Sequence, residues 1–205
     1  MAKFITIEGV EGVGKSSVIG TICNELKRRD MKHVLTREPG GTPLAEAIRE
    51  LLVTKHDELM MPLTEVLLFF AARCQHITQL IKPALARGEW VVSDRFTDSS
   101  FAYQGAGRGI AFDKLQALKD WVQGDFKPDC TILLDAPVEI GLARIQSRSK
   151  DRIEEETVEF FYRVRDFYLQ CARDNPKRYR VVKADQSIEQ VQQDVVAIMR
   201  EVMST

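Results

Sequence analysis

The sequence has 205 residues, of which 44% are hydrophobic and 29% charged, a balance typical of a folded globular protein rather than a disordered or fibrous one. This length predicts one α/β domain that spans residues 1–205. The formal net charge of −1 provides no global positive field for a polyanion, so nucleic-acid binding is disfavoured.

Strand-like and helical patterns alternate along the chain. Short β-branched or apolar runs predict five strands, at residues 3–8, 33–36, 90–94, 130–135 and 180–183. Helical periodicity covers residues 15–29, 63–87 (with a kink expected at Pro83), 112–123, 138–146, 157–174 and 187–202. The alternation predicts a five-stranded parallel sheet flanked by helices, with ligands at the carboxyl ends of the strands.

The cysteines and the longest apolar stretch indicate the cellular location of the protein. The four cysteines form no C-x-x-C pair, and the histidines complete no metal-ligand spacing with them, which favours free thiols in a reducing compartment. The first residues run directly into a strand-like pattern instead of a targeting segment. The apolar stretch 66–74 is far shorter than the about 20 residues that span a bilayer. The sequence therefore predicts a soluble cytoplasmic protein without membrane contact.

Residues 9–16 match the phosphate-binding pattern G-x-x-x-x-G-K-[ST] directly after the first predicted strand. Glycines allow a tight loop whose backbone N–H groups face phosphate oxygens, and the following helix adds its positive dipole end. Lys15 would neutralise charge on the β- and γ-phosphates, and the Ser16 hydroxyl would ligate Mg²⁺. The predicted ATP-binding residues are Gly9, Val10, Glu11, Gly12, Val13, Gly14, Lys15, Ser16 and Ser17.

This loop leaves the second substrate open, because GTPases, motor ATPases and small-molecule kinases share it. A GTPase is disfavoured, since the chain has no N-K-x-D segment. The strand 90–94 ends in Asp94, which could hold Mg²⁺ through water, and Arg95 follows it as a candidate phosphate ligand. An Asp-Arg pair at a strand end is equally often a surface salt bridge.

Further motifs follow in a fixed order: Arg-Glu-Pro-Gly-Gly-Thr at 37–42, Leu-Leu-Phe-Phe-Ala-Ala-Arg at 67–73, Asp-Arg-Phe at 94–96, Ser-Ser-Phe-Ala-Tyr-Gln-Gly at 99–105 and Arg-Ser-Lys-Asp-Arg-Ile-Glu at 148–154. Together with the phosphate loop, they resemble the thymidylate kinase family, in its bacterial form with a basic lid, across most of the chain. The resemblance implies the P-loop nucleoside monophosphate kinase fold, with a lid at about 147–153. It also implies phosphoryl transfer from ATP to dTMP with Mg²⁺, and a homodimer.

The resemblance assigns a dTMP-binding set: Glu11, Arg37, Glu38, Phe69, Arg73, Arg95, Ser99, Ser100, Tyr103 and Gln104. In this assignment Phe69 stacks on thymine, and Arg73, on the same helix face, donates to a base carbonyl. A core position is the alternative for Phe69, whereas Phe70 is expected to be core. Glu11 accepts from the sugar 3′-hydroxyl, with a solvated side chain as its alternative.

The remaining roles are also implied by the resemblance. Arg37 and Arg95 contact the monophosphate, and Glu38 shapes the pocket beside them. Tyr103 crowds C2′ and so favours deoxyribose, while the two serines and Gln104 contact base or sugar. The glycine-rich stretch 105–109 follows no strand, so it is interpreted as a loop between helices.

Phosphoryl transfer is accelerated by positive charge placed on the migrating group. In the family that the chain resembles, this charge comes from an arginine of the phosphate loop or of the lid. Here Gly12 stands where the first form has a basic residue, so the lid is predicted to supply it, from Arg148 or Arg152, unless this segment is only a solvated surface. The predicted catalytic residues are Lys15, Arg95, Arg148 and Arg152.

Two alternative functions stay open on the sequence. One is another nucleoside monophosphate or deoxynucleoside kinase of the same architecture. The other, disfavoured by the near-neutral charge, is a regulatory or DNA-associated P-loop ATPase.

Overall fold

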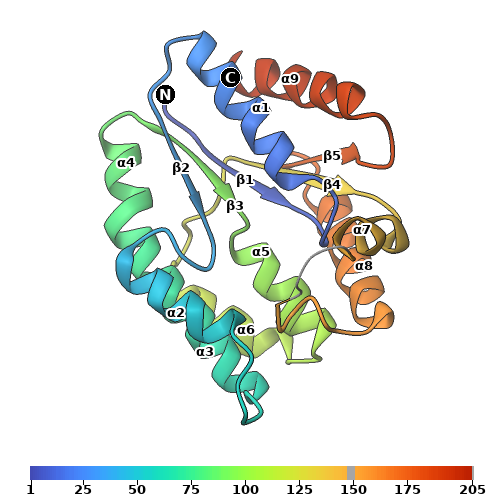
Figure 1. Ribbon diagram of the computed structural model, residues 1–205. Helices are drawn as coiled ribbons and strands as arrows, with labels where there is room; N and C mark the ends of the chain where they lie inside the picture. Colours follow the sequence, from blue (N-terminus) through green and yellow to red (C-terminus); the bar gives the residue numbers. More distant parts are fainter. Residues whose placement is uncertain (147–150, 205) are drawn as a thin grey trace.

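The structure is a computed structural model that describes residues 1–146 and 151–204 (Figure 1). Five parallel strands form one sheet in the order β2-β3-β1-β4-β5. The strands are β1 Phe4–Glu8, β2 His33–Arg37, β3 Trp90–Asp94, β4 Cys130–Asp135 and β5 Tyr179–Lys183. The predicted sheet is confirmed, and each predicted strand is present with its ends shifted by at most one residue.

Helices cover both faces of this sheet (Figure 1). In chain order they are α1 Lys15–Arg28, α2 Pro43–Val53, α3 Pro62–His76, the π-helical η1 Ile77–Ile81, α4 Lys82–Ala86, α5 Thr97–Ser100, the π-helical η2 Phe101–Gly107, α6 Phe112–Val122, α7 Val138–Ile145, α8 Val158–Asp174 and α9 Ile188–Ser204. Two of these regions, α2 and the pair α5–η2, are absent from the sequence prediction.

The predicted helix 63–87 is present as α3, η1 and α4, which follow one another without a break. Pro83 has no N–H group to donate and its ring crowds the preceding turn. The wider π turn that comes just before it, η1, is where the helix departs from regular geometry.

The interpretation of residues 105–109 as a loop is wrong for its first part, because η2 continues to Gly107. A Cβ atom at Gly105 would lie 2.7 Å from Phe112, and one at Gly107 would lie 2.4 Å from Phe160. These glycines therefore let the helix pack closely on aromatic rings, and the connection to α6 begins only at residue 108.

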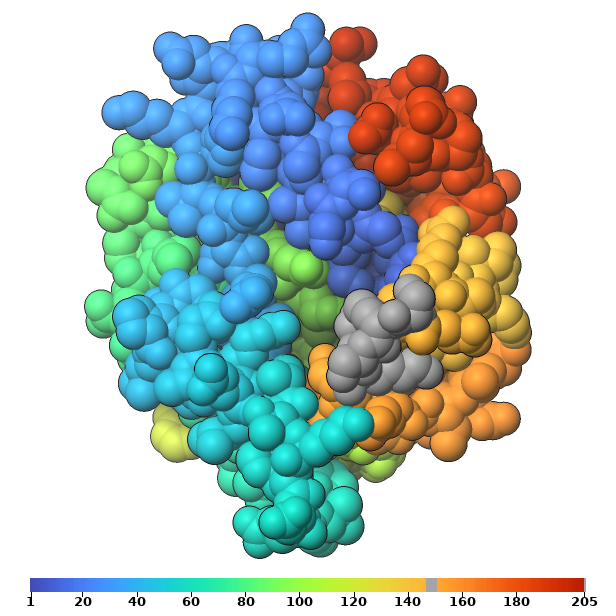
Figure 2. All heavy atoms as spheres, in the orientation of Figure 1, coloured from blue at the N-terminus to red at the C-terminus, as the bar shows by residue number. Residues whose placement is uncertain are grey.

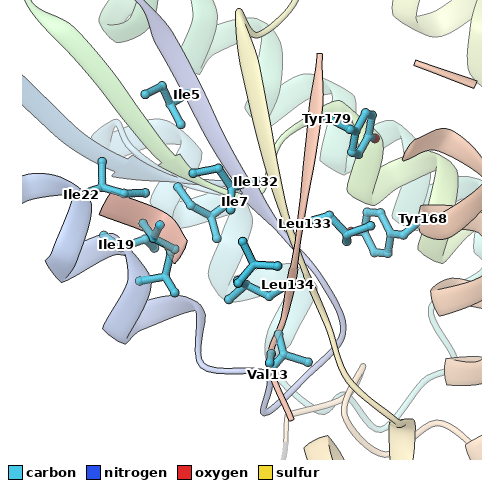
Figure 3. Packing of buried hydrophobic residues seen from close by; sticks show 14 of the residues in the cluster. Ile5, Ile7, Val13, Ile19, Ile22, Ile132, Leu133, Leu134, Tyr168 and Tyr179 are labelled. Carbon is cyan, nitrogen blue, oxygen red and sulfur yellow. The ribbon is translucent and has the colours of Figure 1, made fainter. Parts of the chain in front are cut away.

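The core lies on both sides of β1, β3 and β4, whose residues are nearly all buried. Along β4, Ile132 and Leu134 lie toward Ile19 of α1, whereas Leu133 lies toward Tyr168 of α8 (Figure 3). Central parallel strands with apolar side chains on both faces require this cover of helices. No helix among residues 1–146 and 151–204 is long and apolar enough to cross a membrane.

Candidate active site

The loop between β1 and α1 needs glycine at several positions. Gly9, Gly12 and Gly14 have φ angles of 138°, 71° and 93°, which side chains rarely adopt. A Cβ atom would lie 2.5 Å from the Leu134 carbonyl oxygen at Gly9 and 2.0 Å from the Gly141 carbonyl oxygen at Gly12. Close packing against β4 and α7 therefore fixes the loop's shape.

Lys15 lies folded onto this loop. Its Nζ donates to the carbonyl oxygens of Gly9 (3.1 Å) and Val10 (2.9 Å). Burial, and next the charge of Arg95, lower the pKa of Lys15 to about 8, so the ammonium group is still charged at neutral pH. Positive charge is thus held at the loop, where a triphosphate would need it.

The other predicted ATP-binding side chains divide into two groups. Val10 and Val13 are buried in the core, so only their backbone N–H groups could contact a phosphate. Ser16 and Ser17 are exposed in the first turn of α1, where a hydroxyl group is free to approach a ligand.

Asp94 ends β3 close to this helix start. Its Oδ1 is buried and has no hydrogen-bond partner within the described part of the chain. Ser16, Asp94 and Arg37 line one cavity of about 590 Å³. A hydroxyl and an unpaired carboxylate oxygen are hard donors that suit Mg²⁺, which would complete its coordination with phosphate oxygens and water.

A second cavity, of about 80 Å³, lies on the same hollowed side of the molecule, between the phosphate loop and helices α2 and α3 (Figure 2). Seven residues of the predicted dTMP-binding set line it: Glu11, Glu38, Phe69, Arg95, Ser99, Tyr103 and Gln104. The lining also includes five residues outside the predicted dTMP-binding set: Pro39, Arg49, Val53, and Asp151 and Ile153 of the predicted lid. Arg37 lines the larger cavity instead, and Arg73 and Ser100 line neither.

Glu11 accepts hydrogen bonds from two side chains at this cavity. Arg95 Nη2 donates to Glu11 Oε1 over 2.8 Å, and the Tyr103 hydroxyl group lies 2.8 Å from both Glu11 oxygens. Glu11 is only 9% exposed, so the alternative of a solvated side chain is wrong. Burial alone would lower the pKa of Arg95, but Tyr103 and Glu11 outweigh it and raise that pKa, so the guanidinium is charged.

Arg73 lies behind the cavity and is 1% exposed. Its Nε donates to Glu38 Oε2 over 2.8 Å and its Nη2 donates to Ser100 Oγ over 2.9 Å. Its Nη1 is buried without a hydrogen-bond partner among the described residues. Phe70 is buried as predicted, with the Arg73 guanidinium 4.8 Å from its ring centre.

Several residues of this site have no signal in the sequence. His76 Nδ1 lies 3.0 Å from Glu38 Oε1 and supports the carboxylate that pairs with Arg73. Arg49 reaches the second cavity from the unpredicted helix α2. Arg144 of α7 donates to the carbonyl oxygens of Gly12 (3.2 Å) and Ala184 (3.3 Å), next to the phosphate loop.

Glu8, the last residue of β1, is also missed by the prediction. Its carboxyl group accepts from Phe96 N (2.8 Å), Ser99 Oγ (2.7 Å) and the Tyr168 hydroxyl group (2.7 Å). Burial, and next the charge of Asp98, raise the pKa of Glu8 to about 7. A glutamate at the end of an apolar strand was the only hint of this group.

Arg152 contacts α2 and α3 rather than the phosphate loop. Its Nε donates to the Leu52 carbonyl oxygen over 3.0 Å, and its Nη2 lies 2.5 Å from Glu65 Oε2. Arg148, the other candidate lid arginine, and most of the predicted lid 147–153 lie outside the described residues.

Comparisons with known proteins show which family this chain belongs to. The thymidylate kinase family model matches residues 7–195. Thymidylate kinases of Vesicomyosocius okutanii (52% identity) and Methylobacillus flagellatus (52%) each align over 97% of both chains, and that of Pseudomonas fluorescens (53%) over 94% of this chain and 92% of the relative.

The crystal structure of thymidylate kinase from Ehrlichia chaffeensis superposes with a TM-score of 0.79 at 34% identity, covering 97% of this chain and 98% of that one. This likeness confirms the predicted P-loop nucleoside monophosphate kinase fold. A family model that spans most of the chain, and relatives that share half of its residues, make this chain a member of the thymidylate kinase family.

Proposed function

We propose that this protein transfers the γ-phosphoryl group of ATP to dTMP, giving ADP and dTDP. The observation that carries the proposal is the position of Arg95 between the two anion sites. Its Nη1 donates to the Gly9 carbonyl oxygen of the phosphate loop over 3.1 Å, and its Nη2 holds Glu11 at the second cavity. An arginine there would contact an acceptor phosphate where it meets the γ-phosphate of ATP.

The reaction needs no protein nucleophile. An oxygen of the dTMP phosphate attacks the γ-phosphorus in line, and the bond to the β–γ bridging oxygen breaks, leaving ADP. Lys15 and Arg95 position the two anions and stabilise the charge that develops between them. Mg²⁺, held by Ser16 directly and by Asp94 through water, would neutralise phosphate charge when bound.

The catalytic lid arginine belongs to the same proposal. Arg152 would have to leave Glu65 and the Leu52 carbonyl oxygen to reach the transferring group. Arg148 is the second candidate, and alanine substitutions at the two positions separate them.

The base and sugar assignments have support of different strength. Phe69 is half-buried at the wall of the second cavity, which suits stacking on thymine. Tyr103 and Ser99 line the same cavity, and Ser100 acts through Arg73. Arg37 pairs with Glu46 over 2.8 Å at the rim of the larger cavity, so it would bind a phosphate only after exchanging that partner.

A coupled assay of ADP release across dTMP, dUMP, UMP, dGMP and AMP tests the proposed function. We expect dTMP to be strongly preferred, and Lys15→Ala to lower kcat by about a hundredfold or more, because charge on the transferring phosphates loses its partner. Lys114→Ala, at an exposed position of α6, is the matched control.

Preference for another monophosphate would favour the alternative of a different nucleotide kinase. ATP turnover without any acceptor would favour a regulatory ATPase. Unchanged turnover in Lys15→Ala would contradict the proposed mechanism altogether.

We also propose a homodimer that forms through α2 and α3. Apolar side chains stay exposed on these helices, at Leu44 (56%), Leu51 (50%), Leu63 (59%) and Leu67 (48%). The two helices pack against each other, and exposed apolar side chains on neighbouring helices suit a protein interface. The predicted single domain and cytoplasmic location are retained; all four cysteines are free, which suits a reducing compartment.

A further inference from the structure

Glu65 of α3 is an acidic residue buried beside the second cavity, with 1% of its surface exposed. Its Oε1 accepts from Gln104 Nε2 (2.9 Å) and from Arg108 Nε (2.6 Å). Its Oε2 lies 2.5 Å from Arg152 Nη2. Both oxygens therefore face only donors.

The surroundings keep Glu65 ionised. Burial alone would raise the pKa of Glu65, but the charge and hydrogen bond of Arg108, the Gln104 amide and the Arg152 charge outweigh it and lower that pKa. An ionised carboxylate can only accept hydrogen bonds. Gln104 must therefore turn its NH₂ group toward Glu65.

This constraint fixes the other end of the Gln104 amide. Gln104 is 1% exposed and lines the second cavity, and its Oε1 accepts no hydrogen bond from residues 1–146 or 151–204. The carbonyl oxygen is thus the part of the amide that is left for a ligand.

A hydrogen-bond acceptor held at this wall matches one edge of a pyrimidine and not another. Thymine and uracil present an N3–H donor next to the O4 acceptor. Cytosine presents an N3 acceptor in that place, so its N3 would meet the Gln104 carbonyl oxygen as acceptor against acceptor.

We propose that Glu65 is a positioning residue that fixes the Gln104 amide, so that the cavity selects a pyrimidine with an N3–H group and rejects cytosine. The inference rests on the proposed function for the identity of the cavity as the base site. It goes beyond that function by assigning the discrimination to a residue outside the cavity wall.

The test compares dUMP with dCMP, which differ only at this edge of the base. Their dissociation constants are measured by titration of the purified protein with millimolar nucleotide. We expect the wild type to prefer dUMP, and Glu65→Met to reduce that preference about tenfold or more, because the Gln104 amide becomes free to turn over. Damage to the fold or to the lid would weaken the binding of both nucleotides alike, and the ratio of their dissociation constants would not change.

Three further variants make the test independent of how well Glu65→Met folds. Gln104→Met removes the amide and should reduce the preference at least as much. The reversed pair Glu65→Gln with Gln104→Glu should retain it, because a carboxylate introduced at position 104 has only acceptor oxygens. Glu156→Met, which removes the other partner of Arg108 (2.8 Å) without touching Gln104, should match the wild type.

The results that would overturn this inference differ from those that would overturn the proposed function. A wild type that binds dCMP as well as dUMP overturns the inference, as does an unchanged ratio in Glu65→Met or Gln104→Met, or a lost preference in the reversed pair. The proposed function is judged separately, by dTMP turnover of the wild type. A protein that prefers dUMP over dCMP but transfers no phosphoryl group would contradict that function alone.

Discussion

Two buried glutamates near the site have opposite protonation behaviour, and their neighbours explain the difference. Glu65 faces two arginines, which lower its pKa despite burial. Glu8 faces hydroxyl groups and a backbone amide, and burial together with the Asp98 charge raises its pKa to about 7. Whether a buried glutamate is ionised here therefore depends on the groups that face it rather than on how deeply it is buried.

The raised pKa of Glu8 predicts a pH-dependent stability. In the unfolded chain the group titrates near 4.5, so between pH 4.5 and 7 the folded protein keeps a proton that the unfolded chain has lost. The contribution of Glu8 to the free energy of unfolding is complete below pH 4.5 and is lost as pH rises to 7. We expect the wild type to lose up to about 3 kcal/mol relative to Glu8→Gln over this range.

Urea denaturation at several pH values measures this difference, with Glu58→Gln, at an exposed position, as the control. A difference between wild type and Glu8→Gln that does not vary with pH would show that Glu8 titrates normally.

The proposed site residues that the sequence predicts, such as Lys15, Asp94 and Arg95, sit in contiguous motifs. Sequence reasoning missed Glu8 with Tyr168, which are 160 positions apart and meet only because β1 and α8 pack together. It also missed His76, which looks like an ordinary helix residue until Glu38 lies beside it. Pairs of this kind exist only in the folded chain.

Among the elements, the strands and long helices were predictable and the two short helical regions at the site were not. In α2, apolar residues occupy both the buried side, at Ala45 and Leu52, and the exposed side, at Leu44 and Leu51, which hides the helical period. In η2, glycines suggested a loop, but packing against Phe112 and Phe160 decides the conformation.

The close contact between α7 and the phosphate loop predicts that a larger side chain between them lowers stability. A Cβ atom at Gly141 would lie 2.3 Å from the Glu11 carbonyl oxygen. We expect Gly141→Ala to lower the free energy of unfolding by about 1–3 kcal/mol, although alanine is the better helix former, because the loop must move away.

Gly20→Ala is the control, because a Cβ atom at Gly20 in α1 would meet open space. This variant should raise the free energy of unfolding by up to about 1 kcal/mol. Denaturant titration compares the two variants. Equal stabilisation by both alanines would mean that the loop and α7 are not in tight contact.

For the whole molecule, the prediction concerns assembly. The double substitution Leu63→Glu with Leu67→Glu places two charges on the exposed face of α3, and we expect it to convert a dimer to a monomer. Sedimentation velocity measures the change in mass, with Ile188→Glu on α9 as the control that should remain dimeric. A wild type that sediments as a monomer would contradict the proposed interface.

The second cavity encloses only about 80 Å³, with Asp151 and Ile153 in its wall, whereas pockets for small ligands typically measure about 300–1,000 Å³. Molecules packed in a lattice in this shape would have to deform in order to admit a nucleotide. Crystals grown from the protein alone should therefore crack or lose diffraction when they are soaked in dTMP, so that co-crystallisation becomes the practical route to the complex.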